Sequence, residues 1–266
     1  LSTQLAKELG ITVVPVYVVF GNKSYRDHID ISEDEFYEKL LHGPVHPTTS
    51  QPTPQDFVEI YNSLGKEADG ILSIHVSTKL SGTVNSAEQA KKLTTAGCPI
   101  EIIDSLNVSM ALGTMVVAAA RLAKAGRSLA EITAEVKKMV PNTRLLALFD
   151  TLEYLAKGGR IGKAKSLLGS ILNIKPLLTL KEGGFHPVGQ ARNRSKGKER
   201  LLEFAQASKD IEDVCIVYST TPDEAEALAD NIRVFPRDRI TISRLGPALG
   251  AHGGPGVLVL VARTKV

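Results

Sequence analysis

The sequence is poor in several residue types that define whole classes of protein. It holds no Trp and only two Cys among 266 residues. Cys98 and Cys215 are far apart and lie in apolar segments, so they suit neither a disulfide framework nor a set of metal ligands. So little cysteine indicates a reducing compartment. We therefore expect a cytoplasmic protein with no bound metal.

Long apolar runs are also missing. The longest run, residues 110–122, is interrupted by Gly113 and Arg121, and it is shorter than the roughly 20 residues that a membrane-spanning helix needs. The N-terminal residues lack the basic-then-apolar pattern of an export signal. Because the sequence starts at Leu1 rather than at Met, we expect it to begin inside the natural chain.

The usual signatures of catalysis and cofactor binding are absent as well. No G-x-S-x-G motif occurs. GGRIGKA (158–164) comes near a phosphate-binding loop, but Ala164 stands where Ser or Thr would hold magnesium. GAHGGPG (250–256) lacks the glycine spacing of a dinucleotide-binding turn. We therefore expect no cofactor, and we expect that the protein is not an enzyme.

Charge is distributed unevenly along the chain. The net charge is +3, yet residues 157–200 contain eleven Lys and Arg against two acidic residues. One basic segment on an otherwise acidic protein favours an acidic partner, a phosphate group or a membrane surface. A solvated basic face is the alternative interpretation.

Short β-branched runs alternate with longer amphipathic segments, which is typical of an α/β protein. The clearest predicted strands are residues 71–77, 101–106, 144–150, 214–220 and 256–263. We expect two domains. Residues 1–145 would form a three-layer α/β domain on a parallel sheet. Residues 146–266 would form an α/β domain with a mixed sheet, including a hairpin at KEGG (181–184).

Several helix starts carry capping signals. Ser128 followed by Glu131 predicts a capping box. Thr53 and Thr221, each directly before a proline, predict hydroxyl caps with proline in the first turn.

Three polar segments rich in small residues lie where α/β proteins usually hold ligands. They are HPTTSQPTP (46–54), STKLSGTVNSA (77–87) and GAHGGPG (250–256), which contains His252. The second follows the carboxyl end of a predicted strand, where parallel sheets bind ligands. We expect Ser81 and Gly82 to open the next helix, with backbone N–H groups facing an anion.

These residues also have plain structural interpretations. Thr49 and Ser50 could shape a turn, Ser81 could cap a helix, and His252 could be a loop histidine without a ligand. Considered together, two hydroxyls and an imidazole suit the binding of a carboxylate.

Five segments resemble, in order along the chain, the motifs of the bacterial DegV family. They are TSQP (49–52), STKLSGTVNSA (77–87), KGGRIG (157–162), RNRSKGKERL (192–201) and AHGGPG (251–256). The resemblance covers essentially the whole chain. It also places a strand ending in Asp-Ser ahead of Leu1.

The resemblance implies a protein that holds one long-chain fatty acid, of the palmitate or oleate class, between two domains. Thr49, Ser81 and His252 would contact the carboxylate, with Ser50 and Gly82 beside them. A separate ATP-dependent fatty acid kinase would phosphorylate the bound acid, and the acyl phosphate would feed phospholipid synthesis. The protonation state of His252 stays open.

The resemblance also implies a kinase-binding surface on the basic segment, formed by Arg192, Arg194 and Lys196. The same face could touch an anionic membrane transiently while lipid is exchanged. Two apolar stretches, residues 110–123 and 166–174, are candidate walls for the acyl chain. For both, the pattern favours an ordinary buried helix over a cavity wall, because buried helices are apolar all round.

Two other functions remain as alternatives. A hydrolase or acyltransferase would use Ser81 with His252, although no acidic partner for the histidine is evident. A nucleic-acid-binding module would use the basic segment, but residues 157–200 hold a single aromatic, Phe185. Because single-strand binders rely on aromatic stacking, we expect no nucleic-acid partner.

Overall fold

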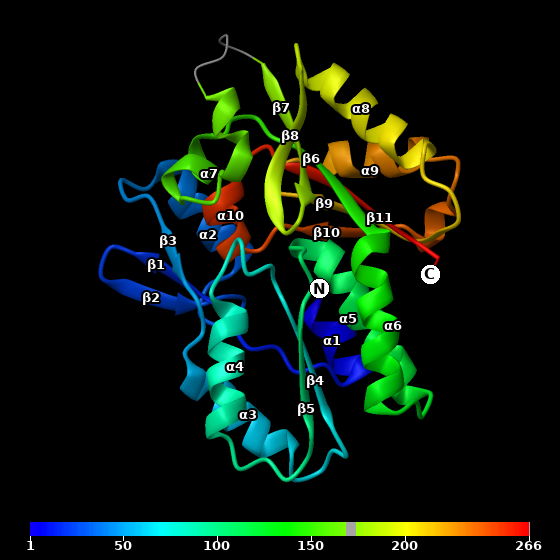
Figure 1. Ribbon diagram of the computed structural model, residues 1–266. Helices are drawn as coiled ribbons and strands as arrows, with labels where there is room; N and C mark the ends of the chain where they lie inside the picture. The colour runs from blue at the N-terminus through cyan, green and yellow to red at the C-terminus, as the bar shows by residue number, and fades with distance from the viewer. Residues whose placement is uncertain (169–173, 266) are drawn as a thin grey trace.

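The computed structural model describes residues 1–168 and 174–265 and has an α/β architecture (Figure 1). The helices and strands of the first half, in chain order, are α1 Thr3–Leu9, β1 Tyr17–Phe20, β2 Lys23–Arg26, α2 Glu33–His42, β3 Thr48–Ser50, α3 Pro54–Leu64, β4 Ile71–His75, α4 Thr83–Leu93, β5 Ile100–Asp104, α5 Ser109–Lys124 and α6 Leu129–Asn142.

The second half contains the main sheet and the elements that cover it. In chain order they are β6 Thr143–Leu148, α7 Glu153–Lys157, the 3₁₀ helix η1 Gly162–Leu167, β7 Lys175–Lys181, β8 Gly184–Ala191, α8 Arg194–Gln206, β9 Ile211–Tyr218, α9 Pro222–Asn231, the 3₁₀ helix η2 Arg237–Arg239, β10 Thr241–Arg244, α10 Pro247–Gly253 and β11 Leu258–Thr264.

The first half is built on β4 and β5, which pair in parallel as expected. Helices α3 and α4 cover one face of this pair, where Phe57 and Tyr61 are buried. Helices α5 and α6 cover the other face, where Met115 and Val136 are buried. These three layers occupy the lower half of Figure 1. The free edge of β4 has no strand beside it among the described residues.

A small antiparallel sheet in the first half was not predicted. Its strand order is β2-β1-β3, and β3 takes up part of the segment 46–54, which we had assigned to a loop. The signal was present in the sequence, because Gly21-Asn22 is a two-residue turn between two runs of β-forming residues.

The second half contains a mixed six-stranded sheet, with strand order β10-β9-β11-β6-β7-β8. Only the β10–β9 pair is parallel. The KEGG hairpin is confirmed as the β7–β8 turn, with Glu182 and Gly183 at φ of 52° and 80°. The boundary expected between residues 145 and 146 falls inside β6, and all of β6 belongs to this sheet.

The period-two alternation of strand side chains divides the six-stranded sheet into two apolar faces. Leu146, Leu148 and Ile216 pack with α8 and α9 on the outer face. Leu145, Ala147 and Val217 point the other way, toward α5 and α7. The sheet thus presents an apolar face to the first half of the chain, and this face borders the site.

Candidate functional site

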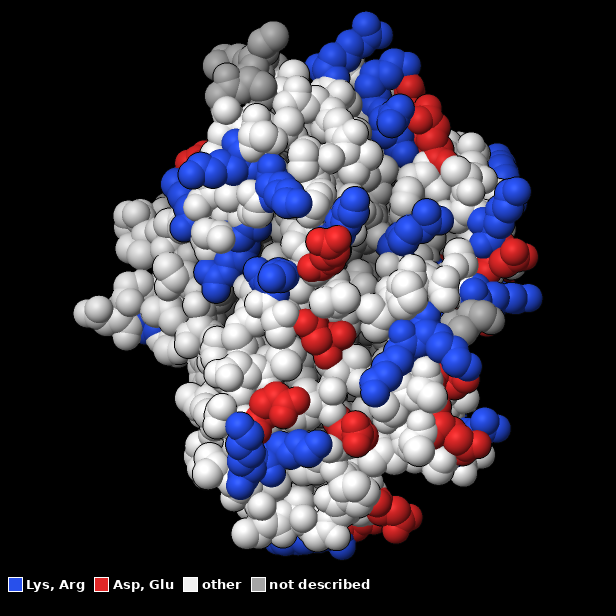
Figure 2. Space-filling view, in the orientation of Figure 1, with Lys and Arg blue, Asp and Glu red and all other residues white. Residues whose placement is uncertain are grey.

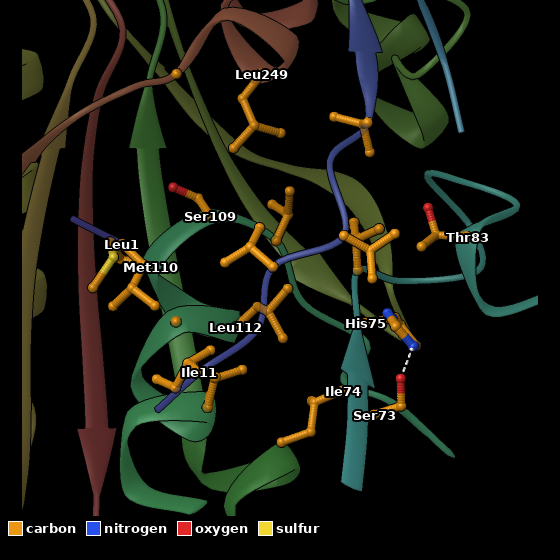
Figure 3. Close-up of a pocket in the computed structure, with 18 of the residues that line it drawn as sticks. Leu1, Ile11, Ser73, Ile74, His75, Thr83, Ser109, Met110, Leu112 and Leu249 are labelled. Atoms are coloured by element: carbon orange, nitrogen blue, oxygen red, sulfur yellow. Dashed lines mark hydrogen bonds between the residues drawn. The ribbon is translucent and has the colours of Figure 1, made fainter. Parts of the chain in front are cut away.

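A cavity of about 1600 Å³ lies between the two halves of the chain. Its walls come from the inner face of the six-stranded sheet, from β4, from α5 and from the segment between α1 and β1. Figure 3 shows Ile11, Ile74, Met110 and Leu112 around this space. Most of the lining is hydrocarbon, so the cavity suits an apolar ligand.

Helix α5 and the sheet supply much of the apolar wall. From α5, Met110, Leu112 and Gly113 line the cavity, so the stretch 110–123 borders it and is more than the ordinary buried helix that we had favoured. The sheet adds Ala147, and Phe149 follows directly after β6; both are buried. The second candidate wall, residues 166–174, includes residues 169–173, which lie outside the described part of the chain.

A polar cluster closes one end of the cavity. Thr49 of β3 and His252 of α10 meet there, with 2.7 Å between Thr49 Oγ1 and His252 Nε2. Both side chains line the cavity, and Ser50 and Ser81 line it beside them. The structure therefore brings Thr49 and His252 into contact, and it places Ser50 and Ser81 on the wall of the same cavity.

His252 is held in its neutral form. Burial, followed by the charge of Arg160 and by His46, lowers its pKa from an ordinary 6.5 to about 4. Its Nδ1 atom is buried and has no hydrogen-bond partner. Gly158 packs directly against that atom, since a Cβ built on this glycine would lie 2.0 Å from Nδ1. The ring is thus fixed between Thr49 and Gly158.

Ser81 lies just before α4 rather than inside it. Its hydroxyl is 2.8 Å from Thr83 Oγ1, and Gly82 is the N-cap residue, without a side-chain cap. Ser81 and Gly82 thus stand at the start of this helix as expected, and the Ser81 N–H closes the preceding turn by donating to the carbonyl of Ser77. Ser81 still lines the cavity near Thr49.

Two residues of the site were not singled out by the sequence. Arg160 lines the cavity and donates from Nε to the carbonyl of Leu80 at 3.1 Å and from Nη1 to that of Gly158 at 2.6 Å. Gln51 reaches from the end of β3 to α4. Both belong to segments quoted above, KGGRIG and TSQP, so the motifs contained the signal.

The Ser–His arrangement that a hydrolase needs is not formed. Ser81 contacts Thr83 rather than His252. His252 uses Nε2 for Thr49, and its Nδ1 has no carboxylate partner to orient the ring. A nucleophile activated in the Ser–His–acid manner would need both contacts.

The three basic residues expected to bind a partner have different environments. Arg192 is exposed, and Lys196 is exposed in an ion pair with Glu199 at 2.5 Å. Arg194 instead turns inward, with 20% of its side chain exposed, and donates to Glu224 at 2.6 Å. It also bonds to the carbonyl of Gly256. Arg194 therefore holds the structure together rather than forming a free surface.

Lys and Arg gather over α8 in the upper right of Figure 2. The described residues contain no helix long and apolar enough to cross a membrane. Within residues 1–168 and 174–265, no group of three or more His, Cys, Asp or Glu side chains could hold a metal ion.

Comparisons with known proteins agree with this architecture. Residues 1–265 match the model described as "Uncharacterised protein, DegV family". A DegV domain-containing protein of Streptomyces coelicolor is 38% identical over 266 residues, which span 96% of this chain and 92% of that protein.

Solved structures of similar sequence share the fold. The structure described as "Fatty Acid Binding of a DegV family Protein from Thermus thermophilus" is 37% identical, with a TM-score of 0.92 over 100% of this chain and 96% of that chain. That of "DegV, a fatty acid binding protein from Bacillus subtilis" is 29% identical, with a TM-score of 0.88 over 100% and 95% of the two chains. The chain therefore belongs to the DegV family.

Proposed function

We propose that this protein binds one long-chain fatty acid between its two halves and presents the carboxylate to a separate ATP-dependent kinase. The observation that carries the proposal is the Thr49–His252 pair at the polar end of an apolar cavity. The relatives from Thermus thermophilus and Bacillus subtilis are described as fatty acid binding, which supports the same ligand class here.

The acyl chain would supply the affinity. Each methylene group transferred from water to an apolar wall contributes roughly 0.8 kcal/mol. The inner sheet face and α5 offer such a wall, through residues such as Ala147, Phe149 and Leu112. A chain of the palmitate or oleate class could therefore be held without a polar contact along its length.

The head group would be oriented by hydroxyls. A carboxylate removed from water must be hydrogen-bonded, because an unpaired buried charge is costly. Thr49 and Ser81 can donate to it, and Ser50 lies beside them. In the ligand-free cavity His252 is neutral, and its Nε2 contact with Thr49 Oγ1 orients that hydroxyl toward the head group.

The chemical step would take place at the ligand. A carboxylate oxygen attacks the γ-phosphorus of ATP, the new O–P bond forms, and the bond from γ-phosphorus to the bridging oxygen of ADP breaks. This chain positions the nucleophile, and the kinase supplies ATP and magnesium. The acyl phosphate would then be a substrate for phospholipid synthesis, and we propose a cytoplasmic location for the protein.

The kinase would meet the exposed basic surface over α8. Arg192 and Lys196 remain candidates for charge pairing with an acidic partner, while Arg194 supports them from inside. Complementary charge chiefly raises the rate of association. A transient contact with an anionic membrane could use the same charges.

Kinase-coupled turnover tests this proposal. The chain, loaded with palmitate, is mixed with a bacterial fatty acid kinase and ATP, and acyl phosphate is trapped with hydroxylamine as the hydroxamate. We expect hydroxamate only when chain, kinase and ATP are all present. Absence of product with the complete mixture, or product from the chain and ATP without kinase, would contradict the proposed role.

A further inference from the structure

We propose that Gln51 is a positioning residue that fixes the spacing between the two head-group hydroxyls, those of Thr49 and Ser81. Gln51 directly follows β3, the strand that carries Thr49. Its side chain crosses to α4, the helix that follows Ser81. This inference rests on the proposed binding of a fatty acid, and it assigns to Gln51, which also borders the cavity, the task of holding two elements in place.

The first observation is a hydrogen bond into the interior. Gln51 Nε2 donates to Ser86 Oγ at 2.9 Å. Ser86 is 1% exposed and lies in the first turns of α4. Gln51 as a residue is exposed, but its amide group is thus anchored on a buried hydroxyl. A buried hydroxyl without a hydrogen-bond partner lowers the stability of the folded state, so this bond stabilises the position of the Gln51 amide.

The second observation is the space at Gly82. A Cβ on Gly82 would lie 1.9 Å from Gln51 Oε1 and 2.7 Å from Cδ. The φ of Gly82 is −77°, which any residue can adopt. The missing side chain of Gly82 therefore leaves the space that the Gln51 amide occupies, and a Cβ there would push the amide out of its present position.

The third observation is the weak support that β3 has elsewhere. It has three residues and pairs with β1 alone in the described sheet. Two side-chain hydrogen bonds hold this segment in place. Thr49 of β3 contacts His252, and Gln51, which directly follows β3, bonds to Ser86 of α4. Removing the second tie would let β3 move relative to α4, and the two hydroxyls would lose their common geometry.

If Gln51 has this role, its substitution should lower the affinity for a ligand with a carboxylate head group more than for one without it. Gln51 borders the cavity through a polar side chain, whereas the apolar walls come from the six-stranded sheet and α5. The binding of the acyl chain itself should therefore persist. We expect Gln51→Leu to lower the affinity for palmitate roughly fivefold to tenfold, in line with the loss of one hydrogen bond. The affinity for hexadecan-1-ol, which has no carboxylate, should change less than about twofold.

The matched control is Gln55→Leu. Gln55 is on the neighbouring helix α3, and its amide bonds to exposed Glu59 at 3.2 Å. This control should leave both affinities unchanged. Ser86→Ala removes the same tie from the α4 side, and it serves as the test if Gln51→Leu does not fold. The double variant should lose no more affinity than either single variant, because both remove one interaction.

The outcomes separate the two proposals. Wild-type chain that binds neither palmitate nor hexadecan-1-ol would overturn the proposed function itself. Wild-type binding with unchanged palmitate affinity in Gln51→Leu would overturn only the role of Gln51. An equal loss for acid and alcohol would also overturn it, since that loss would come from the cavity. A normal affinity in Ser86→Ala beside a weakened Gln51→Leu would mean that Gln51 contacts the ligand directly.

Discussion

Thr49 and His252 are separated by 203 residues in the sequence, and their side chains meet at 2.7 Å in the fold. The contact joins a three-residue edge strand to a short helix that precedes the last strand of the main sheet. It therefore links the two halves of the molecule at the polar end of the cavity. The following predictions test what this contact and its surroundings do.

Thr49→Val should weaken the binding of palmitate by about tenfold, since a hydrogen bond to a charged group is worth more than a neutral one. Valine keeps the shape of threonine but removes the hydroxyl, and it leaves His252 without either hydrogen-bond partner. Competition binding with a fluorescent fatty acid measures the change. Thr48→Val, at an exposed position of the same strand, is the control, and an equal effect there would refute the role of Thr49.

Gly158→Ala should displace the His252 ring. The φ of Gly158 is −78°, so alanine fits the backbone, but its Cβ would lie 2.0 Å from His252 Nδ1. Overpacking of this kind costs about 1–3 kcal/mol of stability, and palmitate affinity should fall with it. Gly189→Ala, which meets nothing within 4 Å, should change neither quantity. Urea unfolding and ligand competition together check both effects.

The stability of the protein should fall as the pH drops from about 6.5 to about 4. Burial lowers the pKa of both His75 and His252 from 6.5 to about 4. Each ring therefore takes up its proton more readily in the unfolded chain, so the free energy of unfolding rises with pH across this window. Well above pH 6.5 these rings are neutral in both the folded and the unfolded chain, so their contribution to the free energy of unfolding no longer changes with pH.

His252→Gln provides the direct check on this dependence. Urea unfolding between pH 7.5 and pH 4.5 should show a shallower slope, by up to about one proton, because one of the rings whose pKa is lowered by burial is removed. His42→Gln, at the exposed end of α2, is the control and should keep the full slope. A slope that stays the same in His252→Gln would mean that this ring is not held neutral.

Arg192 and Arg194, two positions apart, should behave differently when substituted. Arg194→Gln should lower the free energy of unfolding by about 2 kcal/mol, because it breaks charged hydrogen bonds to Glu224 that are partly shielded from water. Arg192→Gln should leave stability unchanged, since its side chain is exposed. It should instead raise the apparent Michaelis constant in the kinase assay. Equal stability losses in both variants would contradict this division.

Helix caps were predicted correctly where the residues that form them are close together in the sequence. The predicted capping box of Ser128 with Glu131 and the predicted hydroxyl cap of Thr53 are both formed, and Asp56 completes a capping box with Thr53. Thr221 was also predicted to cap a helix, but it makes no side-chain cap hydrogen bond. Its hydroxyl accepts from Arg194 at 3.4 Å instead, so a tertiary contact overrides the local preference.

The candidate site could be predicted only in part. The motifs that resemble the DegV family include Thr49, Ser81 and His252. No pattern in the sequence shows which of the two hydroxyl residues, Thr49 or Ser81, contacts His252. The inward turn of Arg194 and the packing of Gln51 over Gly82 depend on neighbours distant in sequence. Burial and partners of this kind appear only after the chain has folded.

Native mass spectrometry of the freshly purified full-length chain, followed by lipid extraction, tests the central claim most directly. The account predicts an adduct with a mass on the order of a few hundred daltons that extracts as a long-chain fatty acid. Such a ligand should survive purification because each buried methylene contributes roughly 0.8 kcal/mol to its affinity. The Thr49→Val variant should carry less of it. A chain that is empty, and that takes up neither palmitate nor oleate when these are added, would contradict the account.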